Sequence, residues 1–304
     1  AFTLANGVTY VEAAVERGLL VDEFAPRLSF FFAAHNNLIE EVAKFRAARR
    51  IWAELMKKRF GAENKRSMWM RMHVQTSGCA LTAQQPINNI TRVTIQTLAA
   101  VLGGAQSIHT NSFDEALALP SERAVRTALR TQQIVAHESG ATDTIDPLGG
   151  SYYLETLTDE MEEGFWDYLE TIEGKGGVVK CIESGFFQRE IADSSYEFQK
   201  EVEAGERIVV GVNKFKTGDD WIPTRLLRVH HEDMEEQIER VKKMKAGRDK
   251  AKVEGALDRL RKDIERDENL MPAIVGAVKE YVTVGEICDL LRGMYGDYQE
   301  LIVI

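Results

Sequence analysis

The chain has 304 residues, of which 44% are hydrophobic, so it is long enough for one large folded domain or two modest ones. Its formal net charge of -10 and sequence pI of about 5.3 argue against general attraction to nucleic acid or to anionic lipid. Its apolar stretches are too short to span a bilayer and no signal peptide is recognisable, so we expect a cytoplasmic protein without membrane or nucleic-acid partners.

The first part of the chain alternates helical and strand patterns. Apolar residues at helical spacing predict helices over residues 6–18, 38–60, 88–102 and 122–139. Apolar runs predict strands over residues 28–34, 69–75 and 105–110, the first of them buried on both faces. Strands that alternate with helices indicate an α/β fold with a parallel sheet, either doubly wound or part of a (β/α)8 barrel.

The pattern changes at Asp146, where a turn-rich segment is followed by mostly helical sequence. Residues 208–212 are a candidate short strand and residues 285–295 a last small helix. The densely charged stretch at residues 231–268 is typical of a solvated helix or helix pair. We therefore expect residues 1–145 to form the α/β part and residues 146–304 a mainly helical extension.

Polar residues gather at the ends of the predicted strands, where ligands bind in both α/β architectures. His73 and Gln75 share one face of the second strand, and either a hydrogen-bonded core histidine or a site residue fits His73. Asn111 and Glu115 follow the third strand, where they suit either a helix cap or the hydroxyls of a sugar. Before the first strand, Arg27 has the fork of donors that binds a phosphate.

Other catalytic and metal-binding patterns are absent from the sequence. The three cysteines are widely separated, which predicts free thiols. No Walker loop, Gly-x-Ser-x-Gly elbow, His-Glu-x-x-His site or Asp-x-His-x-x-Gly arrangement occurs. We predict no metal site in this chain.

Several segments, taken in order, resemble the coenzyme B12-dependent acyl-CoA mutases of the methylmalonyl-CoA mutase family. The segments are residues 24–32, 73–78, 84–89, 106–120, 146–152, 210–214 and 284–289. The resemblance implies the last three strands and helices of a (β/α)8 TIM barrel, followed by a mostly helical C-terminal region. It also implies an intramolecular transferase, an isomerase, in which adenosylcobalamin supplies the radical for carbon-skeleton isomerisation of an acyl-CoA.

The resemblance also assigns site residues. His73 and Gln75 correspond to catalytic positions beside the reacting acyl group. The substrate-binding positions are Arg27, Ser29, Phe31 and Ser107, of which Arg27 and Ser29 contact the CoA part. The cofactor-contacting positions are Gly78, Gln106, Asn111, Glu115 and Ala118.

Methylmalonyl-CoA/succinyl-CoA is the first substrate pair that the resemblance implies. Cys79 and Leu148 stand where methylmalonyl-CoA mutases often carry tryptophan. In this respect the chain resembles large subunits that include those of isobutyryl-CoA and 2-hydroxyisobutyryl-CoA mutases. A non-catalytic assembly module of such a complex is a further alternative.

The family pattern implies partners for this chain. The first five barrel strands are expected on an N-terminal half-barrel polypeptide, and the cobalt ligand on another domain or a separate cobalamin-binding small subunit. We therefore expect a hetero-oligomer that binds an acyl-CoA substrate and is active only with its partner polypeptides.

Overall fold

The computed structural model describes residues 1–218, 226–227 and 231–299. These residues form two compact units, one that extends to Leu227 and one that lies within residues 231–299. In the described ranges, no helix is long and apolar enough to cross a lipid bilayer.

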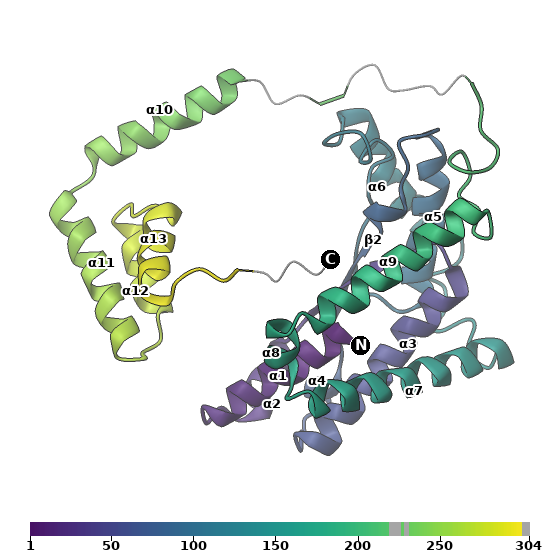
Figure 1. Cartoon of the computed structure of the whole chain (residues 1–304), viewed down its shortest axis with the longest axis horizontal. Helices are drawn as coiled ribbons and strands as arrows, with labels where there is room; N and C mark the ends of the chain where they lie inside the picture. Colours follow the sequence, from purple (N-terminus) through teal and green to yellow (C-terminus); the bar gives the residue numbers. More distant parts are fainter. Residues whose placement is uncertain (219–225, 228–230, 300–304) are drawn as a thin grey trace. The chain divides into compact units, whose positions relative to one another are not determined.

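The first unit contains a parallel three-stranded sheet in the order β1-β2-β3. Figure 1 labels its central strand, β2, among the helices of this unit. β1 spans Phe30–Ala34, β2 spans Met72–Thr76 and β3 spans Ser107–His109. Helix α3 (Leu38–Glu54) lies between β1 and β2 in the chain, and α5 (Asn88–Leu102) lies between β2 and β3, as parallel strands require. The three predicted strands are confirmed, and this small parallel sheet in a mostly helical chain is compatible with a partial barrel.

The other helices belong either to the first unit, together with the sheet, or to the second unit. In the first unit they are α1 (Phe2–Glu16), α2 (Val21–Phe24), η1 (Ala25–Arg27), η2 (Leu55–Arg59), α4 (Lys65–Met68), η3 (Gly78–Ala80), α6 (Glu122–His137), α7 (Tyr152–Gly174), α8 (Val178–Glu183) and α9 (Phe186–Ala204). In the second unit they are α10 (His231–Gly247), α11 (Lys250–Glu265), α12 (Met271–Lys279) and α13 (Val284–Tyr295).

One face of the sheet is packed in the main core. Met72 and Val74 of β2 are 2% and 0% exposed, and they belong to the same apolar cluster as Trp52 of α3. Phe30 of β1 contacts the Trp52 ring edge-to-face with centroids 4.7 Å apart. Apolar residues at alternate strand positions therefore hold α3 against this face.

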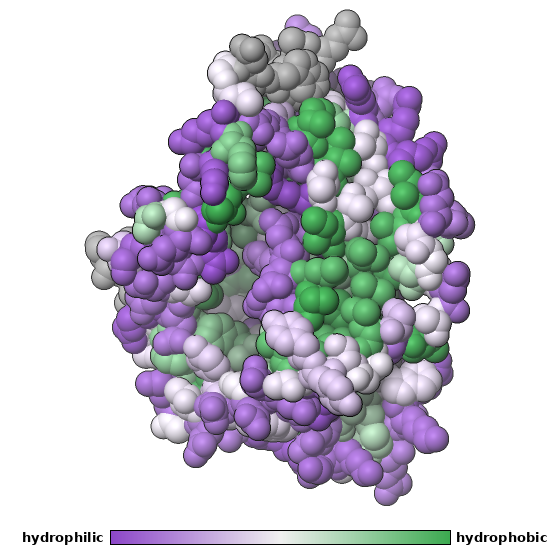
Figure 2. Space-filling view, turned by 90° about the vertical axis from the view of Figure 1, so that its right-hand side faces the viewer, coloured by the Kyte–Doolittle hydropathy of each residue, from purple (hydrophilic) through white to green (hydrophobic). Residues whose placement is uncertain are grey.

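The opposite face of the sheet, which we call the open face, is not covered in the same way. Strand register places Phe31 beside His73 and His73 beside Ser107, with Gln75 in the next row. The expectation that β1 is buried on both faces is wrong, because Phe31 is 59% exposed. Figure 2 shows that apolar side chains also gather in a patch on one surface of the molecule.

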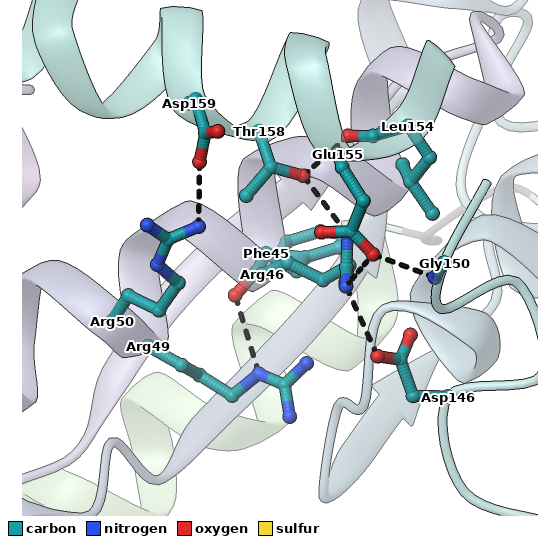
Figure 3. A network of polar contacts seen from close by, with 10 residues as sticks. All are labelled: Phe45, Arg46, Arg49, Arg50, Asp146, Gly150, Leu154, Glu155, Thr158 and Asp159. Carbon is teal, nitrogen blue, oxygen red and sulfur yellow. Dashed lines mark hydrogen bonds and ion pairs between the residues drawn. The ribbon is translucent and has the colours of Figure 1, made fainter. Parts of the chain in front are cut away.

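A polar network joins α3 to the turn before α7 and to α7 itself (Figure 3). The Arg46 guanidinium donates to Glu155 Oε1 at 2.8 Å, to Asp146 Oδ2 at 3.2 Å and to Thr158 Oγ1 at 3.1 Å. The backbone N–H of Gly150 donates to the same Glu155 oxygen at 2.8 Å. Because α7 packs along α3 through these contacts, α7 belongs to the same compact unit as the sheet, and this unit extends to Leu227.

The segment at residues 208–212 is not a strand, contrary to the sequence prediction. Val210 forms a single isolated bridge with Lys214, and the backbone between them turns through Gly211 at φ +82°. Asn213 holds this turn by accepting from Val209 N at 2.7 Å. Side-chain hydrogen bonds to the local backbone compete with strand pairing here.

The second unit is a small helical cluster. Leu260 and Ala277, both 0% exposed, lie in its apolar core. Glu286 closes a capping box at the start of α13, where it accepts from Thr283 N at 2.9 Å. Hydrogen bonds from Arg248 hold the pKa of Glu286 well below its usual range, and the hydrogen bonds from Thr283 act in the same direction despite partial burial.

We expect the stability of the second unit to fall as the solution is acidified. Since the pKa of Glu286 is lower in the folded state, its ionised form stabilises folding above the unfolded pKa of about 4.3, and this contribution is lost as pH falls toward the folded pKa. Peptide-resolved hydrogen exchange of α13 across this pH range measures the loss. Glu286→Gln should lower protection at neutral pH and flatten the acid dependence. An unchanged dependence in this variant would contradict the assignment.

Candidate active site

His73 is held in the middle of the open face by its neighbours on both sides. Its Nδ1 lies 2.8 Å from Ser107 Oγ, and its ring centroid lies 5.1 Å from that of Phe31. If the Ser107 hydroxyl donates to Nδ1, the proton of the neutral ring is on Nε2. The arrangement then presents an N–H donor beside an aromatic ring, which suits a carbonyl oxygen of a bound molecule.

Gln75 and Asn111 form a second polar group at the carboxyl end of the sheet. Gln75 Nε2 donates to Asn111 Oδ1 at 3.0 Å, and Asn111 N donates to Thr76 Oγ1 at 2.8 Å. Asn111 is only 1% exposed, yet its Nδ2 has no hydrogen-bond acceptor among the described residues. A buried amide donor without an acceptor is energetically costly, so Asn111 Nδ2 is well placed to donate to an oxygen atom of a bound ligand.

Gly78 leaves space directly in front of this amide. A Cβ atom at Gly78 would lie 3.2 Å from Asn111 Nδ2 and 3.4 Å from Glu115 Oε1. An amide donor and a carboxylate acceptor beside a residue without a side chain suit the hydroxyl groups of a sugar. The three residues therefore fit a nucleoside ribose.

Asp114 holds in place the residue that caps the next helix. It is fully buried, and its Oδ2 accepts from Ser121 N at 3.1 Å and from Ser121 Oγ at 2.7 Å. Ser121 in turn is the N-cap residue of α6. Since Asn111 and Glu115 lie before this cap, the helix-cap alternative for them does not hold, and both side chains are available to the site.

Arg27 and Ser29 lie at the other end of the sheet, before the first residue of β1. Both are exposed, and Arg27 forms no ion pair within the part of the chain that the structure describes. Ser29 precedes Phe31 by two residues, so it is on the same side of the extended backbone as the open face. The open face thus runs from a free cation at the amino ends of the strands to Asn111 at the carboxyl ends.

A cluster that the sequence prediction did not assign lies beside Gly78. Ser77 Oγ is 3.1 Å from Cys79 Sγ and 3.5 Å from His35 Nε2. His35 directly follows β1, as the site residues follow their strands, and this position was the signal that could have identified it. Cys79, Cys181 and Cys288 are free thiols, and within the described ranges no group of three or more potential ligands could hold a metal ion.

Comparison with known proteins identifies the family to which this sequence belongs. Residues 1–297 match the family model described as methylmalonyl-CoA mutase. The chain belongs to the methylmalonyl-CoA mutase family. Nearly the whole chain is included in the match, so both the open face and the second unit belong to the shared sequence.

Curated members of the methylmalonyl-CoA mutase family agree with this. The chain is 49% identical to the 2-hydroxyisobutanoyl-CoA mutase large subunit of Aquincola tertiaricarbonis, over 99% of the chain and 54% of the relative. It is 44% identical to the methylmalonyl-CoA mutases of Rhizobium meliloti (strain 1021) and Escherichia coli (strain K12), over 98% of the chain and 42% of each relative. The chain therefore spans about half the length of the curated relatives that it matches.

Among the five positions that the family resemblance assigns to cofactor contact, the structure brings together all but one. Ala118 lies in the same series of turns as Glu115, and its N–H donates to Asp114 O at 3.1 Å. Gln106 is the exception, because it lies at the amino end of β3. Its amide already bonds to the backbone of Met72 and of Gly104, at 2.7 Å and 2.8 Å. We therefore leave Gln106 out of the candidate cofactor site.

Proposed function

We propose that this chain forms part of the substrate-binding barrel of an adenosylcobalamin-dependent acyl-CoA mutase, which catalyses a radical carbon-skeleton isomerisation. The observation that carries the proposal is the order of groups along the open face. Arg27 and Ser29 lie at the amino ends of the strands, His73 in the middle, and Asn111 at the carboxyl ends. This order suits a long acyl-CoA whose reactive end meets the cofactor at the carboxyl ends.

In this proposal residues 1–145 supply three strands of a (β/α)8 barrel, and residues 146–304 form the helical extension. Two observations support it: β1 and β3 each have a free edge among the described residues, and the open face carries exposed Phe31. Unpaired strand edges and exposed aromatic surface are normally covered in folded proteins. Further strands, supplied by an N-terminal half-barrel polypeptide, would cover both.

The proposed roles follow the geometry of the site. His73 donates from Nε2 to the acyl carbonyl, and Phe31 excludes water beside it. Gly78, Asn111 and Glu115 hold the adenosyl ribose, with Ala118 alongside. When bound, adenosylcobalamin supplies the radical that starts the rearrangement. The cobalt ligand is assigned to a separate cobalamin-binding small subunit, consistent with the name "large subunit" of the Aquincola relative.

Two acyl-CoA classes are candidate substrates. Methylmalonyl-CoA/succinyl-CoA is the first, since several relatives are named for methylmalonyl-CoA. A 2-hydroxyisobutyryl-CoA or isobutyryl-CoA substrate is the second, favoured by the 49% identity to the Aquincola protein against 44% for the methylmalonyl-CoA mutases. Cys79 beside Ser77 marks the position at which the surroundings of the corrin would differ.

The test is reconstitution of the hetero-oligomer. The chain is combined with the N-terminal half-barrel and the cobalamin-binding subunit, and adenosylcobalamin and a panel of acyl-CoAs are added. We expect isomerisation of one class, accompanied by a change in the cofactor absorption spectrum. If neither isomerisation nor a spectral change occurs with any acyl-CoA, the proposal is wrong.

A second candidate function is a non-catalytic assembly module, favoured by α10. None of the side chains of this helix is buried within the described chain. Its apolar residues Met234 and Ile238 are 48% and 43% exposed, so they are accessible to a partner. The two functions differ in their dependence on the open face. Loss of activity in His73→Ala or Gln75→Ala, with assembly retained, would argue against the assembly module.

A further inference from the structure

A segment distant in sequence lies against the loop that leads into α5. We call residues 206–217 the docked segment. Arg92 of α5 donates from Nη2 to Val210 O at 2.7 Å. Gln85 Nε2, in the preceding loop, donates to Phe215 O and to Thr217 Oγ1, both at 3.1 Å. Two side chains therefore hold the docked segment at two backbone carbonyls and one hydroxyl.

The docked segment has its own fixed shape where it meets the loop. Asn213 Nδ2 donates to Arg207 O at 2.7 Å and to Val202 O at 2.8 Å, which ties the turn to the end of α9. Gly211 fits tightly: a Cβ atom there would lie 3.0 Å from the side chain of Gln85, and its φ of +82° disfavours other residues. The turn in the docked segment is therefore fixed by Asn213, and it fits closely against the side chain of Gln85.

The same arginine holds the loops that follow β2 and β3. Arg92 Nη1 donates to Thr82 Oγ1 at 2.9 Å and to Asn89 Oδ1 at 2.7 Å. Asn89 is fully buried, and its Nδ2 donates to Thr82 O and to Phe113 O, both at 2.9 Å. A single guanidinium therefore joins the docked segment to the loop that follows Gly78 and, through Asn89, to the turns that carry Glu115.

These hydrogen bonds matter energetically because the Arg92 side chain is partly buried. Partial burial lowers the pKa of Arg92, and no carboxylate partner compensates for this within the described residues. A guanidinium stays protonated in proteins, so its N–H groups require the carbonyl and side-chain oxygens that surround it. If the docked segment moves away, Arg92 Nη2 loses its acceptor, and the guanidinium that holds the two loops is less firmly fixed.

We propose that Arg92 is a positioning residue that couples the docked segment to the loops after β2 and β3. It thereby fixes the positions of Gly78, Asn111 and Glu115, which we call the ribose-binding edge. Arg92 does not contact Asn111 or Glu115 itself and acts through Asn89. What the edge binds rests on the proposed function. The coupling itself is a property of this chain and is measurable without any ligand.

Hydrogen exchange tests the coupling on the full chain. Arg92→Ala should raise exchange about tenfold in residues 78–89 and 111–118, and Gly211→Ala should do the same by displacing the docked segment. Arg92→Lys, which keeps the charge but not the fork of donors, should be intermediate. The matched control is Arg123→Ala, at an exposed arginine of α6 whose side chain forms no ion pair or hydrogen bond with any described residue. Unchanged exchange in residues 111–118 in Arg92→Ala or Gly211→Ala would overturn the proposal.

A second measurement separates the coupling from the proposed function. In the assembled enzyme, Arg92→Ala should raise the Kd for adenosylcobalamin by about tenfold while the KM for acyl-CoA changes little. An equal rise in the Kd for adenosylcobalamin and in the KM for acyl-CoA would indicate general damage to the fold and would contradict the positioning role. If the unmodified assembly binds no adenosylcobalamin, the proposed function fails, whereas the exchange result still decides the coupling.

Discussion

Replacing His73 with alanine is expected to lower kcat of the assembled enzyme by about 10²–10³-fold, the effect of losing one fixed donor to a developing charge. The side chain is aimed by Ser107 Oγ at 2.8 Å and by the ring of Phe31, so its Nε2 has a fixed direction. The affinity for adenosylcobalamin should change little, because the ribose-binding groups are at the carboxyl ends of the strands. Steady-state kinetics and cofactor titration measure the two effects separately.

Conservative variants define the role of His73. His73→Gln keeps an amide donor near the position of Nε2 and should recover part of the lost kcat. Ser107→Ala should lower kcat by a smaller factor than His73→Ala, since the hydroxyl no longer fixes which ring nitrogen carries the proton. His137→Ala, at an exposed histidine of α6, is the control. Wild-type kcat in His73→Ala would remove His73 from the site.

Adding a side chain at Gly78 is expected to weaken adenosylcobalamin binding by about 10–100-fold, the cost of one or two hydrogen bonds to a charged or fixed group. In Gly78→Val the new atoms meet Asn111 Nδ2, 3.2 Å from the Cβ position, and Glu115 Oε1, 3.4 Å from it. Both groups must then move away from the ribose. Spectroscopic titration of the assembled enzyme with adenosylcobalamin gives the change in Kd.

A matched glycine separates this effect from general destabilisation. Gly164 lies in α7 with no heavy atom within 4 Å of its Cβ position, so Gly164→Val adds the same atoms in open space. It should leave both the Kd and the thermal stability nearly unchanged. If Gly78→Val binds the cofactor as tightly as Gly164→Val, the ribose does not lie against Gly78.

Local patterns in the sequence were sufficient to predict the three strands and the helices between them. Alternation and helical spacing of apolar residues depend only on neighbouring residues, because they follow from the geometry of each element. The placement of His73, Gln75 and Asn111 near one another followed from the same rule, since the carboxyl ends of parallel strands meet at one edge. Family membership was predicted from short segments and is confirmed over residues 1–297.

Contacts between distant residues were decided only by the tertiary structure. The apolar run of β1 predicted burial on both faces, yet hydrophobicity alone does not say whether a neighbouring element covers Phe31. That α7 belongs to the same compact unit as the sheet also depended on distant contacts, because Arg46 ties the turn and α7 to α3 across about a hundred residues of sequence.

The contacts around Gly78, Asn111 and Glu115, the proposed ribose-binding edge, could likewise not be predicted from the sequence. Whether Asn111 caps a helix or faces a ligand depended on Asp114, which supports Ser121 as the cap of α6. The role of Arg92 depended on a segment that follows it by more than a hundred residues. The sequence by itself determined the three strands and the helices between them, because these follow from local properties of the chain. The tertiary structure alone decided which polar atoms find partners and which do not, because that depends on where distant segments pack.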